Sequence, residues 1–358
     1  MTAERVRVLV IDDSALMRQL LPALLAEDPA IDVVGTAADP YIAREKIKRL
    51  HPDVLTLDVE MPGMDGLKFL ENLMRLRPMP VVMVSSVTHA GTATSLRALD
   101  LGAVDIVAKP QANLRDTLAS IGAELCAKVR AAAQAQLRPL PSLARATERP
   151  VPMPGGGART EQGAIVMGAS AGGTQALTEI LRRLPPTVPG IVIVQHMPPR
   201  FTAYFAERLN DHCALTVHEA RDGDMVAPGT VLIAPGGLHT ALRLTRNGFA
   251  VEVYDGDLVS LHRPSVDVLF ESAARSAGAR AAGVILTGMG NDGARGMRLM
   301  RSRGGYTLAQ SEDSCLVYGM PERAVREGGV CEIAALEDIA DRLVQWAGTD
   351  NAIGAGER

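Results

Sequence analysis

The sequence is poor in aromatic residues, which make up 3% of its 358 residues. Proteins that bind single-stranded nucleic acid stack the bases on aromatic side chains, so this shortage argues against that class. An excess of basic residues is also missing, because 37 Lys and Arg are set against 41 Asp and Glu, for a formal net charge of −4. Proteins that bind DNA or RNA carry a basic surface. We therefore expect no nucleic-acid partner.

Cysteines are few, and long apolar runs are missing. The four cysteines lie far apart and form no CxxC pair or zinc-ligand spacing. This spacing favours reduced thiols, with Cys315 as a buried one, in a cytoplasmic protein. No apolar run reaches the roughly 20 residues that span a bilayer, and the N-terminus MTAERVRVLVIDDS is not typical of a signal peptide. We expect a cytoplasmic monomer without membrane insertion.

Short apolar segments do occur, and in the first part of the chain they are regularly spaced. Residues 5–128 contain five of them: VRVLVI, DVVGTA, DVLTLDV, PVVMVSS and VDIVAKP. The segments between them, such as 14–27 and 66–76, have apolar residues at helical spacing. This alternation is typical of a parallel sheet with helices on both faces. The sequence therefore predicts a doubly wound, flavodoxin-like α/β domain over residues 1–128.

The same alternation returns after a segment of different composition. Residues 129–162 are rich in Pro, Gly, Ala and Arg, which predicts a flexible linker whose first turns extend the preceding helix. Residues 163–347 again contain buried-strand segments, and Asn247-Gly248 between two alternating segments predicts a hairpin turn. We expect a second doubly wound, Rossmann-like parallel-sheet domain that includes an antiparallel hairpin, followed by a disordered tail over 348–358.

Polar residues follow several predicted strands of the first domain. Asp12 and Asp13 follow the first strand, Asp58 ends the third, Ser85 follows the fourth and Lys109 the fifth. The carboxyl ends of parallel strands meet at one edge of a sheet, so these side chains should lie close together. Each alone has a simpler interpretation, such as a helix cap or a solvated lysine. Together, the three carboxylates would repel one another unless a hard cation such as Mg²⁺ lies among them.

At these residues the segment 5–125 resembles the receiver domain of two-component response regulators. The resemblance implies that a histidine kinase phosphorylates Asp58 and that Ser85 and Lys109 contact the phosphoryl oxygens. It also implies a Mg²⁺ site formed by oxygen atoms of four residues, namely Asp12, Asp13, Asp58 and, through its backbone carbonyl, Glu60. Many receivers have an aromatic switch residue where this chain has Ile106, so an aromatic rotamer switch is not expected here.

Three residues of the second domain suggest nucleophilic catalysis. Ser170, His196 and Asp292 each come after an apolar strand, which places them at one edge of a parallel sheet. A serine hydroxyl needs a base to take its proton, histidine suits that task, and a carboxylate would fix the imidazole tautomer. Taken singly, Ser170 could cap a helix, His196 could be structural and Asp292 could form a turn.

The segment GASAGG also allows a nucleotide-binding interpretation, since glycines let the backbone approach a pyrophosphate. That fingerprint requires an acidic residue for the ribose at the end of the next strand. Here the strand ends in Gln195-His196-Met197-Pro198, and no GxxxxGK[ST] motif occurs. The hydrolytic interpretation is therefore favoured.

Four segments, GASAGG, VQHMPPRFT, HRPSVDVLF and LTGMGNDGA, resemble the catalytic domain of chemotaxis protein-glutamate methylesterases. The resemblance implies Ser170 as nucleophile, His196 as general base and then acid, and Asp292 as the residue that orients it. It further implies that the backbone amides of Ala171 and Met289 bind the oxyanion, with no cofactor for the esterase reaction. The segment 262–270 is expected to line the active-site cleft.

The implied function is hydrolysis of glutamate methyl esters on chemoreceptors, with release of methanol and control by phosphorylation of Asp58. The same chemistry would also deamidate glutamines. Two alternatives remain open. The second domain could only bind a partner protein, or the chain could be a nucleotide-dependent oxidoreductase.

Overall fold

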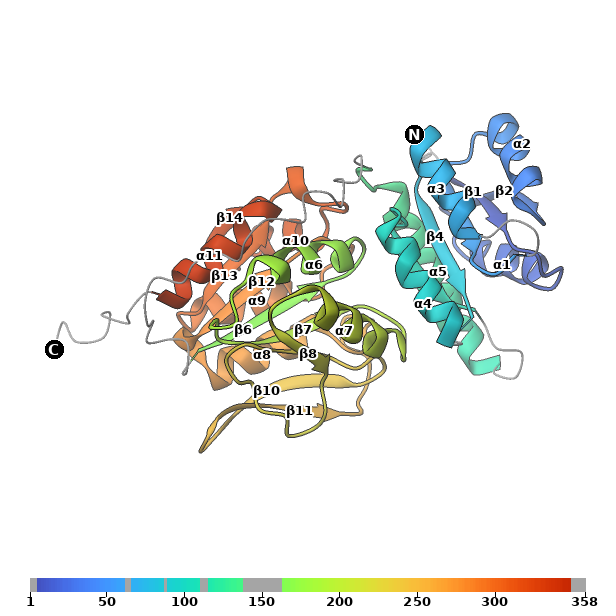
Figure 1. Cartoon of the computed structure of the whole chain (residues 1–358). Helices are drawn as coiled ribbons and strands as arrows, with labels where there is room; N and C mark the ends of the chain where they lie inside the picture. The colour runs from blue at the N-terminus through green and yellow to red at the C-terminus, as the bar shows by residue number, and fades with distance from the viewer. Residues whose placement is uncertain (1–4, 62–65, 87–88, 110–114, 138–162, 349–358) are drawn as a thin grey trace. The chain divides into compact units, whose positions relative to one another are not determined.

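A computed structural model describes residues 5–61, 66–86, 89–109, 115–137 and 163–348 (Figure 1). The chain divides into two compact units, residues 1–141 and 142–358, which we describe separately. Among the described residues, no helix is both long and apolar enough to cross a membrane.

The first unit is a five-stranded parallel sheet with the strand order β2-β1-β3-β4-β5. Its strands are β1 (Val6–Ile11), β2 (Ile31–Ala37), β3 (Val54–Asp58), β4 (Val81–Ser85) and β5 (Asp105–Ala108). Its helices are α1 (Met17–Leu25), α2 (Pro40–Leu50), α3 (Gly66–Leu76), α4 (His89–Asp100) and α5 (Arg115–Ala133). Helix α1 packs on α5, and α3 packs on α4. Every residue of β3 and β4 is buried, and most of them are apolar, as expected for strands covered on both faces.

The second unit contains a seven-stranded sheet with the order β14-β13-β12-β6-β7-β9-β8, in which all neighbouring pairs are parallel. Its strands are β6 (Ala164–Ala169), β7 (Gly190–Gln195), β8 (Thr216–Glu219), β9 (Thr230–Ile233), β12 (Ala281–Ile285), β13 (Tyr306–Gln310) and β14 (Glu332–Ala334). Its helices are α6 (Gly173–Arg183), α7 (Phe201–His212), α8 (Val266–Ser276), α9 (Ala294–Ser302), α10 (Met320–Arg326) and α11 (Leu336–Gly348). Two 3-10 helices, Gly278–Arg280 and Glu312–Ser314, complete these elements.

The helices of this unit form two packed groups. Helix α6 contacts both α7 and α11, whereas α9 contacts both α8 and α10. A separate antiparallel hairpin, β10 (His239–Thr245) and β11 (Gly248–Tyr254), lies against α8 (Figure 1). Its two-residue loop is 246–247, because Thr245 pairs with Gly248. Gly248 therefore begins β11, and the turn lies one residue earlier than predicted. Gly248 has φ +115°, a conformation that favours glycine.

The fold class predicted from the sequence is confirmed, because both units are parallel α/β sheets and the hairpin is present. Strands β13 and β14 were not predicted. Helix α5 extends to Ala133, so the start of the predicted linker is helical as expected. Residues 138–162 of that linker and 349–358 of the predicted tail lie outside the described residues, and the domain bounds stay a prediction.

Strand order in the second sheet places a change of direction at β6. Strand β6 pairs with β7 on one side and with β12 on the other. At such a point the loops after neighbouring strands diverge and leave a crevice at their carboxyl ends, where ligands of doubly wound sheets bind. Ser170, His196 and Asp292 all follow these three strands.

Candidate functional sites

The carboxyl edge of the first sheet gathers an acidic cluster around one lysine. Asp12 and Asp58 are 0% and 1% exposed, and Lys109 Nζ lies 3.1 Å from Asp12 Oδ2 and 2.7 Å from Asp58 Oδ2. One carboxylate oxygen from each of Asp12, Asp13 and Asp58 lies within 4.8 Å of the others. This spacing lets one hard cation contact all three, and oxygen ligands of this kind fit Mg²⁺.

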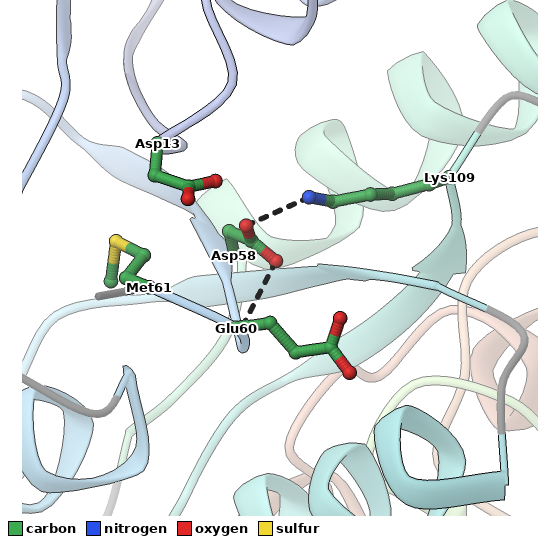
Figure 2. A pocket seen from close by; sticks show the side chains of 5 residues that line it. All are labelled: Asp13, Asp58, Glu60, Met61 and Lys109. Carbon is green, nitrogen blue, oxygen red and sulfur yellow. Dashed lines mark hydrogen bonds and ion pairs between the residues drawn. The ribbon is translucent and has the colours of Figure 1, made fainter.

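Figure 2 shows the pocket beside this cluster, which has a volume of about 480 Å³. Its lining residues are Asp13, Asp58, Glu60, Met61 and Lys109. Asp58 Oδ1 accepts a hydrogen bond from the backbone N–H of Glu60 at 3.2 Å, whereas the Glu60 carboxylate accepts one from Ser86 Oγ at 3.1 Å. The Glu60 side chain is therefore engaged elsewhere, which is consistent with the prediction that only its backbone carbonyl contributes to the metal site.

Two other predicted receiver residues are buried in the sheet. Ser85 ends β4 next to Val84, the residue that pairs with Asp58, and its hydroxyl donates to the Ser86 carbonyl at 3.3 Å. Its backbone carbonyl accepts from the N–H of Lys109 at 2.7 Å, which holds β4 and the lysine together. Ile106 is 2% exposed within β5. The structure thus brings Ser85 near the acidic cluster, and its contact with a phosphoryl group stays a prediction.

Burial controls the charge of Asp58. Removal from water raises the pKa of Asp58 to about 6, and the nearby Lys109 ammonium offsets part of that rise. Burial also opposes the charge of Lys109, but hydrogen bonding and charge attraction to Asp58 outweigh it and raise the pKa of Lys109. Without a bound cation, Asp58 therefore takes up a proton at a higher pH than an ordinary aspartate does.

This raised pKa predicts how stability depends on pH in the absence of divalent cations. Above pH 6 the folded chain bears the full cost of ionised Asp58, at most about 3 kcal/mol. As the pH falls from 6 towards the ordinary value of 3.8, the folded form takes up a proton first and that cost disappears. In EDTA, Asp58→Asn should therefore raise the free energy of unfolding at pH 7.5 by about 1–3 kcal/mol, and by less at pH 5.

Denaturant unfolding of the full chain at the two pH values measures this difference. Asp32→Asn, a change at an exposed residue of β2, serves as the control and should leave the difference near zero. A lower stability of Asp58→Asn at pH 7.5 would show that the ionised carboxylate stabilises the fold.

The second site begins with the adjacent ends of β6 and β7. Ala169 and Gln195, the last residues of these strands, pair with each other, so Ser170 and His196 follow at equivalent positions. The His196 N–H donates to the Ala169 carbonyl at 3.1 Å, and Gln195 Nε2 donates to the Ser170 carbonyl at 2.9 Å. These bonds fix the two backbones side by side, as the strand-end argument predicted.

Ser170 lies in a tight turn between β6 and α6. Its N–H donates to the Thr287 carbonyl at 3.0 Å, and a Cβ at Gly288 would lie 2.8 Å from Ser170 Cβ. The N-cap of α6 is Gly172, at φ +77°, and no side chain makes a capping hydrogen bond there. The interpretation of Ser170 as a helix cap is therefore wrong, because the cap lies two residues later.

His196 and Asp292 form a buried pair. His196 Nε2 lies 2.9 Å from Asp292 Oδ2, with the residues 6% and 1% exposed. Among the described residues, His196 Nδ1 is buried without a hydrogen-bond partner. Since Nε2 faces the carboxylate, the neutral ring carries its proton there and leaves the Nδ1 lone pair free to act as a base.

Asp292 is held by the first turn of α8. Its carboxylate accepts hydrogen bonds from three further donors: Ser265 Oγ at 2.7 Å, the Val266 N–H at 2.7 Å and the Asp267 N–H at 2.9 Å. Burial alone would raise the pKa of Asp292, but the bonds from His196, Asp267 and Ser265 outweigh it and lower that pKa. Asp292 is thus an ionised acceptor at a helix N-terminus, where negative charge is favoured, and not merely a turn former.

The predicted oxyanion donors lie at the same edge. Ala171 is 1% exposed, and its carbonyl accepts from Thr287 Oγ1 at 2.9 Å. Met289 is half-buried in the segment after β12. Within the part of the chain that the structure describes, neither backbone N–H donates a hydrogen bond. Their role as oxyanion donors stays a prediction.

His262 and Ser265 lie in the segment 262–270, which was expected to line the active-site cleft without a role for each residue, whereas Gln195 and Thr287 were not identified as site residues. His262 stacks on His196 with ring centroids 3.7 Å apart and an interplanar angle of 11°. Ser265 precedes the apolar segment of α8, a typical capping position, and this signal could have indicated its place. The roles of Gln195 and Thr287 depend on contacts between distant segments and gave no local signal. Cys315 is 2% exposed, as predicted for a buried thiol.

Comparisons with known proteins agree with this arrangement. The family model described as CheB methylesterase matches residues 165–343, and that described as response regulator receiver domain matches residues 8–119. A protein-glutamate methylesterase/protein-glutamine glutaminase of Shigella flexneri is 49% identical over 349 residues, covering 98% of this chain and 99% of the relative. The protein of the same name from Pectobacterium atrosepticum is 50% identical over 349 residues, with the same shares of the two chains covered.

A solved structure is similar to the second unit. The catalytic domain of Thermotoga maritima CheB methylesterase is 37% identical, with a TM-score of 0.50, and the match covers 51% of this chain and 98% of that domain. The likeness therefore extends from the receiver part through the methylesterase part of the chain.

Proposed function

The chain belongs to the CheB methylesterase family, and we propose that it hydrolyses glutamate methyl esters of chemoreceptors with Ser170, His196 and Asp292 as its catalytic residues. The protein is a protein-glutamate methylesterase regulated through its receiver domain. The observation that carries the residue assignment is the buried His196–Asp292 pair next to Ser170, with the second ring nitrogen of His196 free.

In the first half of the reaction, Ser170 Oγ attacks the ester carbonyl carbon while His196 Nδ1 takes its proton. The negative charge that develops on the carbonyl oxygen is stabilised by the backbone amides of Ala171 and Met289. Asp292 stabilises the imidazolium that forms. The imidazolium then donates its proton to the departing methoxy oxygen, so methanol leaves and the glutamyl group stays on Ser170.

In the second half, water replaces the methanol. His196 removes a proton from the water as it attacks the acyl-serine, and then returns that proton to Ser170 Oγ. The products are a free glutamate side chain and the original enzyme. A glutamine side chain would pass through the same acyl-serine with ammonia as the leaving group, which accounts for the glutaminase activity in the names of the relatives.

The receiver residues supply the regulation. Asp58 accepts a phosphoryl group from a histidine kinase, and Ser85 and Lys109 contact its oxygens. Oxygens of Asp12, Asp13, Asp58 and Glu60 would hold Mg²⁺, which supplies positive charge that offsets the carboxylates and the phosphoryl group. We place the protein in the cytoplasm as a monomer, and the free state of all four cysteines supports a reducing compartment.

The receiver assignment predicts labelling by a small phosphodonor. Acetyl phosphate should phosphorylate the full chain only with Mg²⁺ present, because otherwise the carboxylates repel the donor. Asp58→Asn should abolish the label. Asp53, whose carboxylate accepts from the Arg7 N–H, precedes β3 at the end opposite to Asp58 and lies outside the pocket, so Asp53→Asn should keep the label. Mass spectrometry measures the added phosphoryl group, and a label that persists in Asp58→Asn or in EDTA would show that the acceptor is misassigned.

A second candidate function is a response regulator whose second domain only binds a partner. The His196–Asp292 pair argues against it, because a binding surface has no need of a buried base and its carboxylate. An ester hydrolysis assay separates the two functions, since a binding domain would give no Ser170-dependent hydrolysis.

A further inference from the structure

The connection from β11 to α8 contains a tight turn with an unusual backbone. Ser260 and Leu261 have φ of +52° and +69°, in the left-handed region. Two hydrogen bonds close the turn, from the Val259 N–H to the His262 carbonyl at 3.1 Å and from the His262 N–H to the Val259 carbonyl at 2.9 Å. Two-residue turns with positive φ at both positions strongly favour Asn and Gly. A leucine is strained there, so its presence calls for a reason outside the folding of the turn.

The tip of this turn is apolar and exposed. Leu261 is 86% exposed and Leu258 is 60% exposed. Neither side chain therefore contributes much to the core of the second unit. Large apolar side chains that are exposed and close together on a surface mark sites of contact with another molecule.

The turn is anchored next to the catalytic residues. His262, which ends it, stacks on His196 at 3.7 Å between ring centroids. Ser260 Oγ donates to Asp267 Oδ2 at 3.2 Å, and the N–H of Asp267 donates to Asp292 Oδ1 at 2.9 Å. Asp267 is itself buried and accepts from the Gly296 N–H at 2.8 Å. The exposed leucines are thus carried by a turn whose base is fixed to the His196–Asp292 pair.

We propose that Leu258 and Leu261 form a docking surface for the protein substrate, contacting apolar side chains that flank the esterified glutamate. The proposal rests on the proposed function, because it takes Ser170 and His196 as the reacting groups. An ester on a protein side chain brings its own backbone and neighbouring residues to the rim of the site. The leucine turn lies at that rim, directly beyond His262, and would be buried only when a protein substrate is bound.

The test compares a protein substrate with a small ester. In the full chain, Leu261→Asn should lower kcat/KM about tenfold on receptor membranes that carry methylated glutamate, because burial of one leucine is lost. Leu258→Asn should have a similar but smaller effect. On a small ester such as N-acetylglutamate γ-methyl ester, both variants should stay within about twofold of the parent. The midpoint of thermal unfolding should not fall for Leu261→Asn, because asparagine accepts positive φ more readily than leucine.

A matched control lies on the β10–β11 hairpin, which precedes the turn in the sequence. Leu244 is 53% exposed and lies near the C-terminal end of β10. His239, at the other end of β10, contacts the Asp257 carbonyl next to the leucine turn. Leu244 is therefore roughly 16 Å along the strand from that end. Leu244→Asn should leave both substrates unaffected. Equal loss on both substrates, or no loss on the receptor substrate, would overturn the proposal. A faster reaction of Leu261→Asn on receptors before phosphorylation would also overturn it, because the leucine would then restrain the enzyme and not dock the substrate.

Ser170→Ala in the same assays separates this proposal from the proposed function. If Ser170→Ala keeps its activity, the catalytic assignment fails. The ratio of kcat/KM on receptor membranes to kcat/KM on the small ester, measured for Leu261→Asn, still shows whether the leucines form a docking surface. If Ser170→Ala is inactive and that ratio is unchanged in Leu261→Asn, the docking surface alone is wrong.

Discussion

Replacement of Ser170 or of His196 by alanine is expected to lower kcat by a factor on the order of 10⁴ to 10⁶, and the double replacement should lower it little further. The reason is that the hydroxyl is not a nucleophile without the base, and the base has no function without the hydroxyl. Among the described residues, His196 Nδ1 is buried without a hydrogen-bond partner, so no other group competes with the serine hydroxyl for this nitrogen.

Hydrolysis of a small glutamate methyl ester measures this loss without any contribution from receptor binding. Two controls change the same residue types elsewhere in the domain. Ser302→Ala removes an exposed hydroxyl at the end of α9, and His218→Ala removes a half-exposed imidazole on β8. Both should retain full activity. Small losses in the two single variants that simply add in the double variant would exclude a serine–histidine unit.

Replacement of Asp292 should reduce both activity and stability. Asp292→Ala leaves His196 without its carboxylate and leaves three donors at the start of α8 without an acceptor. We expect kcat to fall by roughly 10³ to 10⁴, since the tautomer and the imidazolium are no longer stabilised. The free energy of unfolding should fall by about 2–4 kcal/mol, because buried donors lose their partner at a helix N-terminus.

Asp292→Asn distinguishes the two contributions. An asparagine has one acceptor oxygen where the carboxylate has two, so it can retain part of the helix cap but cannot supply the negative charge. It should therefore be more stable than Asp292→Ala while losing nearly as much activity. Asp313→Asn, at an exposed residue, is the control for both measurements. An unchanged unfolding free energy in Asp292→Ala would show that the carboxylate does not hold α8.

The lowered pKa of Asp292 adds a dependence on pH with a defined sign. A carboxylate whose pKa is lower in the folded chain stabilises the fold above its ordinary value of 3.8. That contribution is lost as the pH falls below 3.8 towards the folded value. Asp292→Ala should therefore lose less stability, relative to the parent chain, at pH 3 than at pH 7.

Much of both sites could be predicted because the reacting residues directly follow strands. Ser170 and His196 come one residue after β6 and β7, and Asp58 is the last residue of β3, so sheet topology alone brings each set together. Asp292 is less direct, since it lies seven residues after Ile285 at the end of β12. Its place after an apolar strand and the resemblance at LTGMGNDGA suggested it, but the sequence could not show that it also anchors α8.

The contacts that depend on distant segments could not be predicted. The stacking of His262 on His196 joins residues 66 positions apart in the sequence, and no periodic pattern records such a contact. Strand β13 was missed because two of its four buried residues, Thr307 and Gln310, are polar, so it has no continuous apolar segment. The capping interpretation of Ser170 was wrong because the N-cap of α6 is Gly172, a glycine with positive φ two residues later.

The most direct test is methanol release from methylated receptor membranes by the full chain and by Ser170→Ala, each with and without acetyl phosphate and Mg²⁺. The account predicts release by the parent chain at a rate that acetyl phosphate increases, and no release above background by Ser170→Ala under either condition. Release by Ser170→Ala at the parent rate would contradict it.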